Sequence, residues 1–127
     1  TPAIIERARQ RFPQARLEVR DLLTGSDISP SFDYVLASGI FYLRQSEPMS
    51  YLETMVRRMF ALCRRSVAFN SLSAKAVRRD AREFYADPAQ VFNLCLDITP
   101  YVIVRHDYLP HDFTVYLYRD RQDDRHD

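Results

Sequence analysis

The stretch FDYVLASGIFYL at residues 32–43 decides the fold class of this chain. Within it, residues 34–37 (YVLA) form an almost unbroken apolar run, which is typical of a strand buried on both faces in the middle of a sheet. Ser38 and Gly39 follow at once, so the predicted strand ends in a turn. A central strand of this kind favours an α/β sheet.

An amphipathic helix and a second apolar strand follow this stretch. Ser50 and Glu53 have the spacing of a capping box, and an apolar stripe from Leu52 to Cys63 covers three helical turns. The pattern predicts that the helix continues to Arg65, at its negative C-terminal end. Residues 66–71 (SVAFNS) then predict a second buried strand.

The C-terminal third contains two further helical patterns and a hairpin. Residues 74–86 are charged and are predicted to be helical, and a second helix is predicted from Asp87-Pro88 to Ile98. Residues 101–109 and 113–119 are rich in β-forming residues and are separated by Pro110-His111-Asp112. This pattern predicts a hairpin with a three-residue loop.

The N-terminal part is predicted to form a helix and an edge strand. Thr1 is a candidate N-cap and Pro2 suits the first helical position, so a helix is expected up to Phe12. Residues 15–23 alternate apolar and charged side chains, which is typical of a strand with one wet face at a sheet edge. Residues 1–119 are therefore expected to form one domain, followed by a charged tail at 120–127 that frays.

Composition excludes several classes of function. With two glycines in 127 residues, no glycine-rich phosphate loop can be written in this chain. With a net charge of +1, the chain has no electrostatic attraction for nucleic acid or an anionic membrane, so neither is expected as a partner. No apolar run has membrane-spanning length and no signal peptide opens the chain, which predicts a cytoplasmic protein.

The two cysteines are interpreted as buried apolar residues. Cys63 and Cys95 both lie within apolar helical patterns, as expected for small buried side chains in a reducing compartment. A single disulfide between them stays open as an alternative, whereas no metal-binding spacing occurs.

A resemblance to a known family rests on four segments in this order: FPQARLEVRDLL, FDYVLASGIFYL, SVAFNSL and the hairpin YVIVRHDYLPHDFTVYLYR. Together they resemble the C-terminal two thirds of a class I S-adenosylmethionine-dependent methyltransferase. The sheet of that family has strand order 3-2-1-4-5-7-6, with strand 7 antiparallel. The resemblance implies that residues 15–23, 33–38 and 66–71 are strands 3, 4 and 5, and that the hairpin supplies strands 6 and 7.

The family's strands 1 and 2, its glycine-rich loop and its ribose-binding acidic residue would all precede Thr1. The resemblance therefore implies an incomplete Rossmann-like sheet that belongs to a longer methyltransferase. A gap beside strands 3 and 4 would expose unpaired backbone groups, which favours association with a second copy through the open sheet.

Candidate site residues are those that follow each strand, because ligands of such sheets bind beyond the carboxyl ends of the strands. The resemblance implies cofactor contacts for S-adenosylmethionine at Asp21 and Leu22, which would face the adenine, and at Ser38, Gly39 and Phe41, which would pass beneath the methionine part. Purely structural roles stay open for two of them, a strand-end cap for Asp21 and a core position for Phe41.

The residues expected to contact substrate lie at the same sheet edge. They are Tyr42, Asn70, Ser71 and Tyr108. A cap or turn role stays open for Asn70 and Ser71. His111 is the candidate catalytic base, with a solvated turn histidine as its alternative, and His106 is expected to make a structural hydrogen bond.

The resemblance predicts S-adenosylmethionine-dependent methyl transfer to a small-molecule acceptor, with this chain inactive by itself. A non-catalytic α/β binding or interaction module is the alternative from another class. A nicotinamide-dependent oxidoreductase fragment is disfavoured by the terminal antiparallel hairpin.

Overall fold

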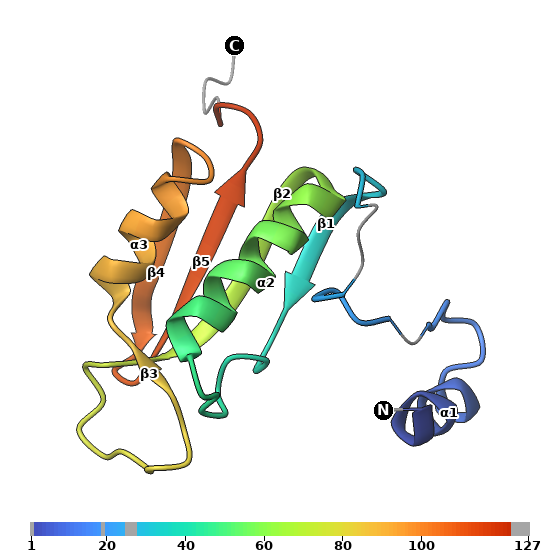
Figure 1. The fold of residues 1–127 in the computed structure, drawn as a ribbon, viewed down its shortest axis with the longest axis horizontal. Coiled ribbons are helices and arrows are strands. Elements are labelled where there is room, and N and C mark those ends of the chain that lie inside the picture. The colour runs from blue at the N-terminus through green and yellow to red at the C-terminus, as the bar shows by residue number, and fades with distance from the viewer. Residues whose placement is uncertain (1, 19, 25–27, 123–127) are drawn as a thin grey trace.

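The chain folds into an open sheet with two helices packed on it and a third helix set apart (Figure 1). The computed structural model describes residues 2–18, 20–24 and 28–122. Its elements are, in order, α1 (Pro2–Arg11), β1 (Phe32–Ala37), α2 (Pro48–Leu62), β2 (Cys63–Ser73), β3 (Tyr85–Ala86), α3 (Pro88–Leu96), β4 (Tyr101–Leu109) and β5 (Asp112–Tyr118). No helix among these residues is long and apolar enough to cross a membrane.

The sheet has the strand order β1-β2-β5-β4, and the short β3 pairs with β2 off this path. β1 and β2 are parallel, whereas β5 is antiparallel to both β2 and β4. β4 therefore runs in the same direction as β1 and β2. This arrangement matches the 4-5-7-6 portion of the expected order, including the antiparallel strand, so the predicted α/β fold class is confirmed.

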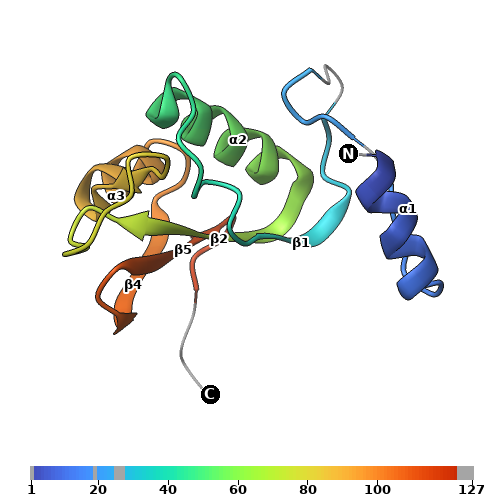
Figure 2. The ribbon, with the colours of Figure 1, turned by 90° about the horizontal axis from the view of Figure 1, so that it is seen from below.

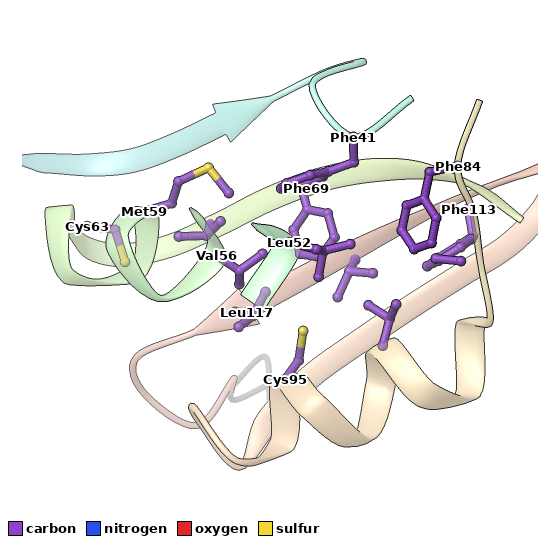
Figure 3. Close-up of a cluster of buried hydrophobic side chains, with 14 residues drawn as sticks. Phe41, Leu52, Val56, Met59, Cys63, Phe69, Phe84, Cys95, Phe113 and Leu117 are labelled. Carbon is purple, nitrogen blue, oxygen red and sulfur yellow. The ribbon is translucent and has the colours of Figure 1, made fainter. Parts of the chain in front are cut away.

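The hydrophobic core lies between the sheet and the helices α2 and α3, which cover the same face (Figure 2). Figure 3 shows its central side chains, among them Phe41, Phe69 and Phe113. Cys63 and Cys95 are both buried and free, so the expected buried thiols are confirmed and no disulfide joins them. Burial raises the pKa of the Cys95 thiol to about 12.

The strand β1 is not buried on both faces, contrary to the prediction. It forms an edge of the described sheet, and Tyr34 and Leu36 are 58% and 77% exposed. The alternate residues Val35 and Ala37 pack against the core. The reason is that no described strand pairs with the outer edge of β1, and no described helix covers the face that carries Tyr34 and Leu36 (Figure 2).

The predicted strand at residues 15–23 is absent from the described part of this segment, which excludes Val19. Backbone groups form a strand only when a neighbouring strand accepts their hydrogen bonds, and no described strand lies beside this segment. Local contacts hold it instead. The Arg9 side chain donates to the Leu17 carbonyl over 3.1 Å, and the Asp21 carboxylate accepts from the Leu23 amide over 2.9 Å.

The helix α2 differs from its prediction at both ends. It begins at Pro48 after Glu47, because proline is preorganised for the first helical turn, so the capping box at Ser50 is wrong. It ends at Leu62, and Cys63 adopts an extended conformation (φ −92°, ψ 149°) that starts β2 three residues earlier than expected. Arg64 and Arg65 are therefore strand residues rather than helix residues.

The segment 74–86 contains no helix, which corrects the helix predicted there. The guanidinium of Arg79 donates to the carbonyls of Ala74 and Ala76, and Asp80 binds the Arg82 side chain, so the charged side chains fold the loop back on itself. By contrast, the predicted helix after Asp87 is present as α3. The Asp87 carboxylate caps it by accepting from the Ala89 amide over 2.9 Å.

The terminal hairpin is present, but its loop is shorter than predicted. Leu109 pairs with Asp112, so only Pro110 and His111 form the turn. Asp112 also pairs with Leu72 of β2, and this second partner draws it into the strand. The predicted N-cap Thr1 and residues 123–127 of the predicted tail lie outside the described residues.

Arg119 closes the C-terminal end of α2. Its guanidinium donates to the carbonyls of Phe60 and Cys63 over 2.6 and 3.1 Å, and it lies 4.2 Å from the centroid of the Phe60 ring. A cation at this position satisfies carbonyls that have no partner within the helix.

We expect Arg119→Gln to lower the free energy of unfolding by about 1–2 kcal/mol, because it removes charge-assisted hydrogen bonds at a helix end. Urea denaturation followed by circular dichroism measures the change. Arg121→Gln, at an exposed position beyond β5, is the matched control. Equal stability of the two variants would show that Arg119 does not cap the helix.

Candidate functional site

The carboxyl ends of β1 and β2 meet at one edge of the sheet, where the loops that follow them pair with each other. The Arg44 amide donates to the Arg82 carbonyl over 2.9 Å, and the Phe84 amide donates to the Tyr42 carbonyl over 2.9 Å. A single β-bridge between Leu43 and Glu83 lies between these bonds. The loop after β1 is thus held against the loop after β2.

Gly39 and Asn70 define the turn that leaves β1. Gly39 has a φ of +76°, a conformation that favours glycine over residues with a Cβ atom. Its amide donates to the Asn70 side-chain oxygen over 2.8 Å, and the Asn70 amide group donates to the Ser38 hydroxyl over 3.3 Å. The structure thus brings together three residues that were expected to line the site. Asn70 links them by fixing the turn.

A second polar cluster lies next to this turn and is centred on Asp112. The Tyr42 hydroxyl donates to one carboxylate oxygen over 2.8 Å, and the Tyr108 hydroxyl donates to the other over 2.7 Å. Tyr108 also lies 2.7 Å from the Thr114 hydroxyl. Asp112 itself is only 5% exposed. We refer to Tyr42, Asp112, Tyr108 and Thr114 as the Asp112 cluster.

Sequence reasoning predicted Tyr42 and Tyr108 at the site but gave no role to Asp112, a predicted loop residue at the same end of the sheet. The available signal was its position in the hairpin, beside Tyr108 and His111 at the carboxyl end of the sheet. What the sequence did not reveal is the contact with Tyr42, which lies 70 positions earlier in the chain.

The phenols of the Asp112 cluster stay protonated at neutral pH. Burial raises the pKa of Tyr42 far above its usual value, and the hydrogen bond to Asp112 makes a smaller contribution in the same direction. Burial also raises the pKa of Tyr108 to about 12, although its hydrogen bond with Thr114 acts in the opposite direction and that with Asp112 adds to the rise. Both hydroxyls therefore remain donors to the carboxylate.

Asp21 and Leu22 lie in a different place from the other predicted residues. Together with Ser31 and Leu62 they line a hollow of about 300 Å³ at the amino end of β1. The structure therefore does not bring them to Ser38, Gly39 and Asn70 at the carboxyl end. Their displacement follows from the missing strand at 15–23, which would have carried them along the sheet.

Two of the predicted site residues are buried. Phe41 is 2% exposed, and its ring packs edge-on against Phe69 and Tyr51 at centroid distances of 5.4 and 5.9 Å. Ser71 is fully buried and donates its hydroxyl to the Leu72 carbonyl. In this structure both side chains face the core and not the solvent-accessible edge.

The histidines of the hairpin differ in their surroundings. His111 is exposed in the turn, while its backbone carbonyl accepts from the Ser73 amide over 2.9 Å. His106 lies 2.7 Å from the Ser73 hydroxyl and stacks on Phe113, so its predicted structural hydrogen bond is confirmed.

An uncovered sheet face adjoins both polar groups. A shallow hollow of about 190 Å³ on this face is lined by Leu36, Ser38, Asn70 and Thr114, among others. Polar donors and acceptors from three different strands and one loop thus converge at a single edge beside an apolar surface. The hollow itself is smaller than the roughly 300 Å³ at which small-molecule pockets usually begin.

Comparison with known proteins places this architecture in context. No protein-family profile matches the chain. The protein Rv1506c of Mycobacterium tuberculosis, whose name assigns it provisionally to the methyltransferases, is 30% identical over 122 residues. The alignment covers 91% of this chain and 72% of that protein.

Solved structures with the same fold include two methyltransferases. The magnesium protoporphyrin IX methyltransferase of Synechocystis PCC 6803 with bound SAH aligns with a TM-score of 0.61 at 10% identity, over 91% of this chain and 57% of its own. The N-methyltransferase NodS of Bradyrhizobium japonicum WM9 aligns with a TM-score of 0.58 at 18% identity, over 93% of this chain and 68% of its own. Both likenesses establish the fold, and both solved chains extend beyond the part that this chain matches.

Proposed function

Because the chain belongs to the class I S-adenosylmethionine-dependent methyltransferase family, we propose that it takes part in transferring a methyl group from S-adenosylmethionine to a small-molecule acceptor. The observation that carries the proposal is the convergence of the Gly39 turn and the Asp112 cluster at the carboxyl edge of β1, β2 and β4. Ligands of open α/β sheets bind at this edge.

The roles of the residues follow from their positions. Ser38 and Gly39 are proposed to contact the methionine part of the cofactor through the turn that Asn70 holds. Phe41 and Ser71 are buried, so we assign them no direct contact with cofactor or acceptor in this chain. Tyr42 and Tyr108 are proposed to face the acceptor. His111, which is exposed in the hairpin turn next to Asp112, is proposed to take up a proton from the acceptor.

S-adenosylmethionine supplies a methyl group that is already activated by a positively charged sulfur. The protein therefore contributes mainly by positioning the acceptor and by stabilising charge. The residues at this edge fit that task, because they offer fixed hydrogen-bonding groups from rigid strands instead of a nucleophile.

We also propose that the chain works as part of a longer methyltransferase domain. The free outer edge of β1 and the uncovered face with Tyr34 and Leu36 are surfaces that a further strand and helix would cover. Without them, the same edge is open to a second copy of the chain, so we expect self-association. On the net charge of +1, we propose that nucleic acid is not a partner. The free, buried cysteines Cys63 and Cys95 fit a reducing compartment, so we propose a cytoplasmic location.

Calorimetric titration with S-adenosylhomocysteine tests the proposal, run on this chain and on a version extended upstream. Binding by the extended version alone would support both the activity and the incomplete domain. Binding by neither would favour the non-catalytic interaction module and would overturn the proposal.

Asp21 provides a sharper test in the extended version. If its carboxylate contacts the adenine there, Asp21→Ala should weaken binding of S-adenosylhomocysteine by about 1–3 kcal/mol through a lost hydrogen bond. Asp33→Ala is the matched control, because Asp33 is exposed and paired with Arg64 on β2. An unchanged affinity in Asp21→Ala would remove Asp21 from the cofactor site.

A further inference from the structure

The Asp112 cluster has used all of its own hydrogen-bond donors. The Asp112 carboxylate can only accept, and it takes the protons of Tyr42 and Tyr108. Since the Tyr108 proton is committed to Asp112, the Thr114 hydroxyl is the donor in the contact between Tyr108 and Thr114. Because Thr114 takes up one lone pair of the Tyr108 oxygen, the cluster still offers a ligand the free lone pairs of the Tyr42 oxygen and one lone pair of the Tyr108 oxygen, with the Thr114 oxygen beside them.

These phenol oxygens are strong acceptors for a physical reason. A hydroxyl that donates to a carboxylate is polarised, so its oxygen becomes more negative and accepts a further hydrogen bond more strongly. Tyr108 is 44% exposed and Tyr42 is partly exposed, so a ligand can reach both rings, whereas the carboxylate is shielded behind them.

Among the described residues, the Asp112 carboxylate has no ion-pair partner. By contrast, Asp107 in the same hairpin is paired with Arg105 at 2.8 Å. A shielded anion without a countercharge favours a positively charged or strongly donating group beside it.

We propose that Tyr42 and Tyr108, polarised by Asp112, bind the amino group of the methyl acceptor, and that the acceptor is therefore a primary amine. An amino group can donate to both phenol oxygens, whereas an alcohol has a single proton to donate and a carboxylate is repelled. The inference rests on the proposed methyl transfer at this same edge. It assigns Tyr42 and Tyr108 as binding residues and Asp112 as a positioning residue that acts through them.

The charge distribution of the reaction agrees with this assignment. The lone pair of the neutral amine forms the new nitrogen–carbon bond, while the carbon–sulfur bond breaks and its electron pair stays on sulfur. Nitrogen gains positive charge as the bond forms, next to the Asp112 cluster, and the methylated ammonium then releases one proton to His111, the base proposed above. A fixed negative charge near the nitrogen stabilises this transition state.

Binding of three matched probes to the chain tests the inference: benzylamine, benzyl alcohol and benzoate. Carbon-13 NMR of ring-labelled tyrosine reports contact at Tyr42 and Tyr108 directly. We expect benzylamine to shift both signals saturably, benzyl alcohol to bind roughly tenfold more weakly, as for one lost charge-assisted hydrogen bond, and benzoate to leave them unchanged.

Variants separate recognition from a structural role. Asp112→Asn should remove the roughly tenfold preference for the amine over the alcohol, whereas loss of a structural contact would weaken all probes alike. Tyr108→Phe, at a half-exposed position, should lower amine affinity several-fold, and Tyr101→Phe at the far end of β4 should change nothing. An amine that binds no better than the alcohol, or a preference that survives Asp112→Asn, overturns the inference.

The result is separable from the test of methyl transfer. Binding of S-adenosylhomocysteine by the extended version without an amine preference would refute the amine site and leave the methyltransferase proposal intact. An amine preference without binding of S-adenosylhomocysteine would support the amine site and refute the methyltransferase proposal.

Discussion

Replacement of Phe41 by alanine is expected to lower the free energy of unfolding by about 3–5 kcal/mol, the usual cost of truncating a buried phenylalanine. Phe41 is 2% exposed and packs against two other aromatic rings, so little of the cavity can be filled by relaxation. Urea denaturation followed by circular dichroism and tyrosine fluorescence measures the loss.

Two companion variants make this result interpretable. Phe41→Leu retains most of the buried apolar volume and should cost markedly less than Phe41→Ala. Phe12→Ala, at a position that is 57% exposed, should change stability by no more than about 0.5 kcal/mol. If Phe41→Ala kept its stability and instead lost S-adenosylhomocysteine binding in the extended version, Phe41 would be a cofactor wall, as its place after β1 suggested in the sequence.

The second large effect is expected at Asp112. Asp112→Leu keeps the approximate size of the side chain but leaves the hydroxyls of Tyr42 and Tyr108 without their acceptor, which should cost about 2–4 kcal/mol of unfolding free energy. In the background of Tyr42→Phe the cost should be smaller, because one of the two bonds is already absent. Additive effects of the two substitutions would show that Tyr42 and Asp112 are not coupled.

Alkaline pH provides an independent view of the same cluster. The pKa values of Tyr42 and Tyr108 are higher in the folded than in the unfolded chain, so their contribution is fully present below about pH 10, the pKa of an unperturbed tyrosine. It is lost as the pH rises through the folded-state pKa of Tyr108, about 12. Between about pH 10 and pH 12, the free energy of unfolding should fall less in the Asp112→Leu variant than in the parent chain. A pH dependence identical to that of the parent chain would contradict the assignment.

The order of strands could be predicted because it is encoded locally. Apolar runs such as residues 66–71 identify strands one at a time, and their succession with helices restricts the topology to few choices. The antiparallel hairpin followed from two β-rich runs separated by turn residues. The Asp87 cap of α3 followed from a similarly short-range signal.

The predictions that were wrong concern features that depend on partners distant in sequence. YVLA at residues 34–37 has the composition of a buried strand, but its burial needs neighbours that the described chain does not place beside it. The alternation of apolar and charged side chains at residues 15–23 likewise indicates a strand, but a strand forms only if another strand pairs with it. The central role of Asp112 depends on contacts from Tyr42, far earlier in the chain, which no local pattern reports.

The two-residue turn of Pro110 and His111 makes this hairpin unequally tolerant of insertions and deletions. Along β5, Asp112 and Thr114 project onto the uncovered face, and Phe113 and Val115 project into the core. An added residue can be accommodated by a longer loop, but a two-residue loop cannot lose one, so β5 would have to slide by one position. That slide would exchange Asp112 with Phe113, placing a carboxylate in the core and an aromatic ring beside Tyr42. A longer loop is therefore compatible with the packing of this hairpin, whereas a shorter one removes the core packing and the Asp112 cluster together.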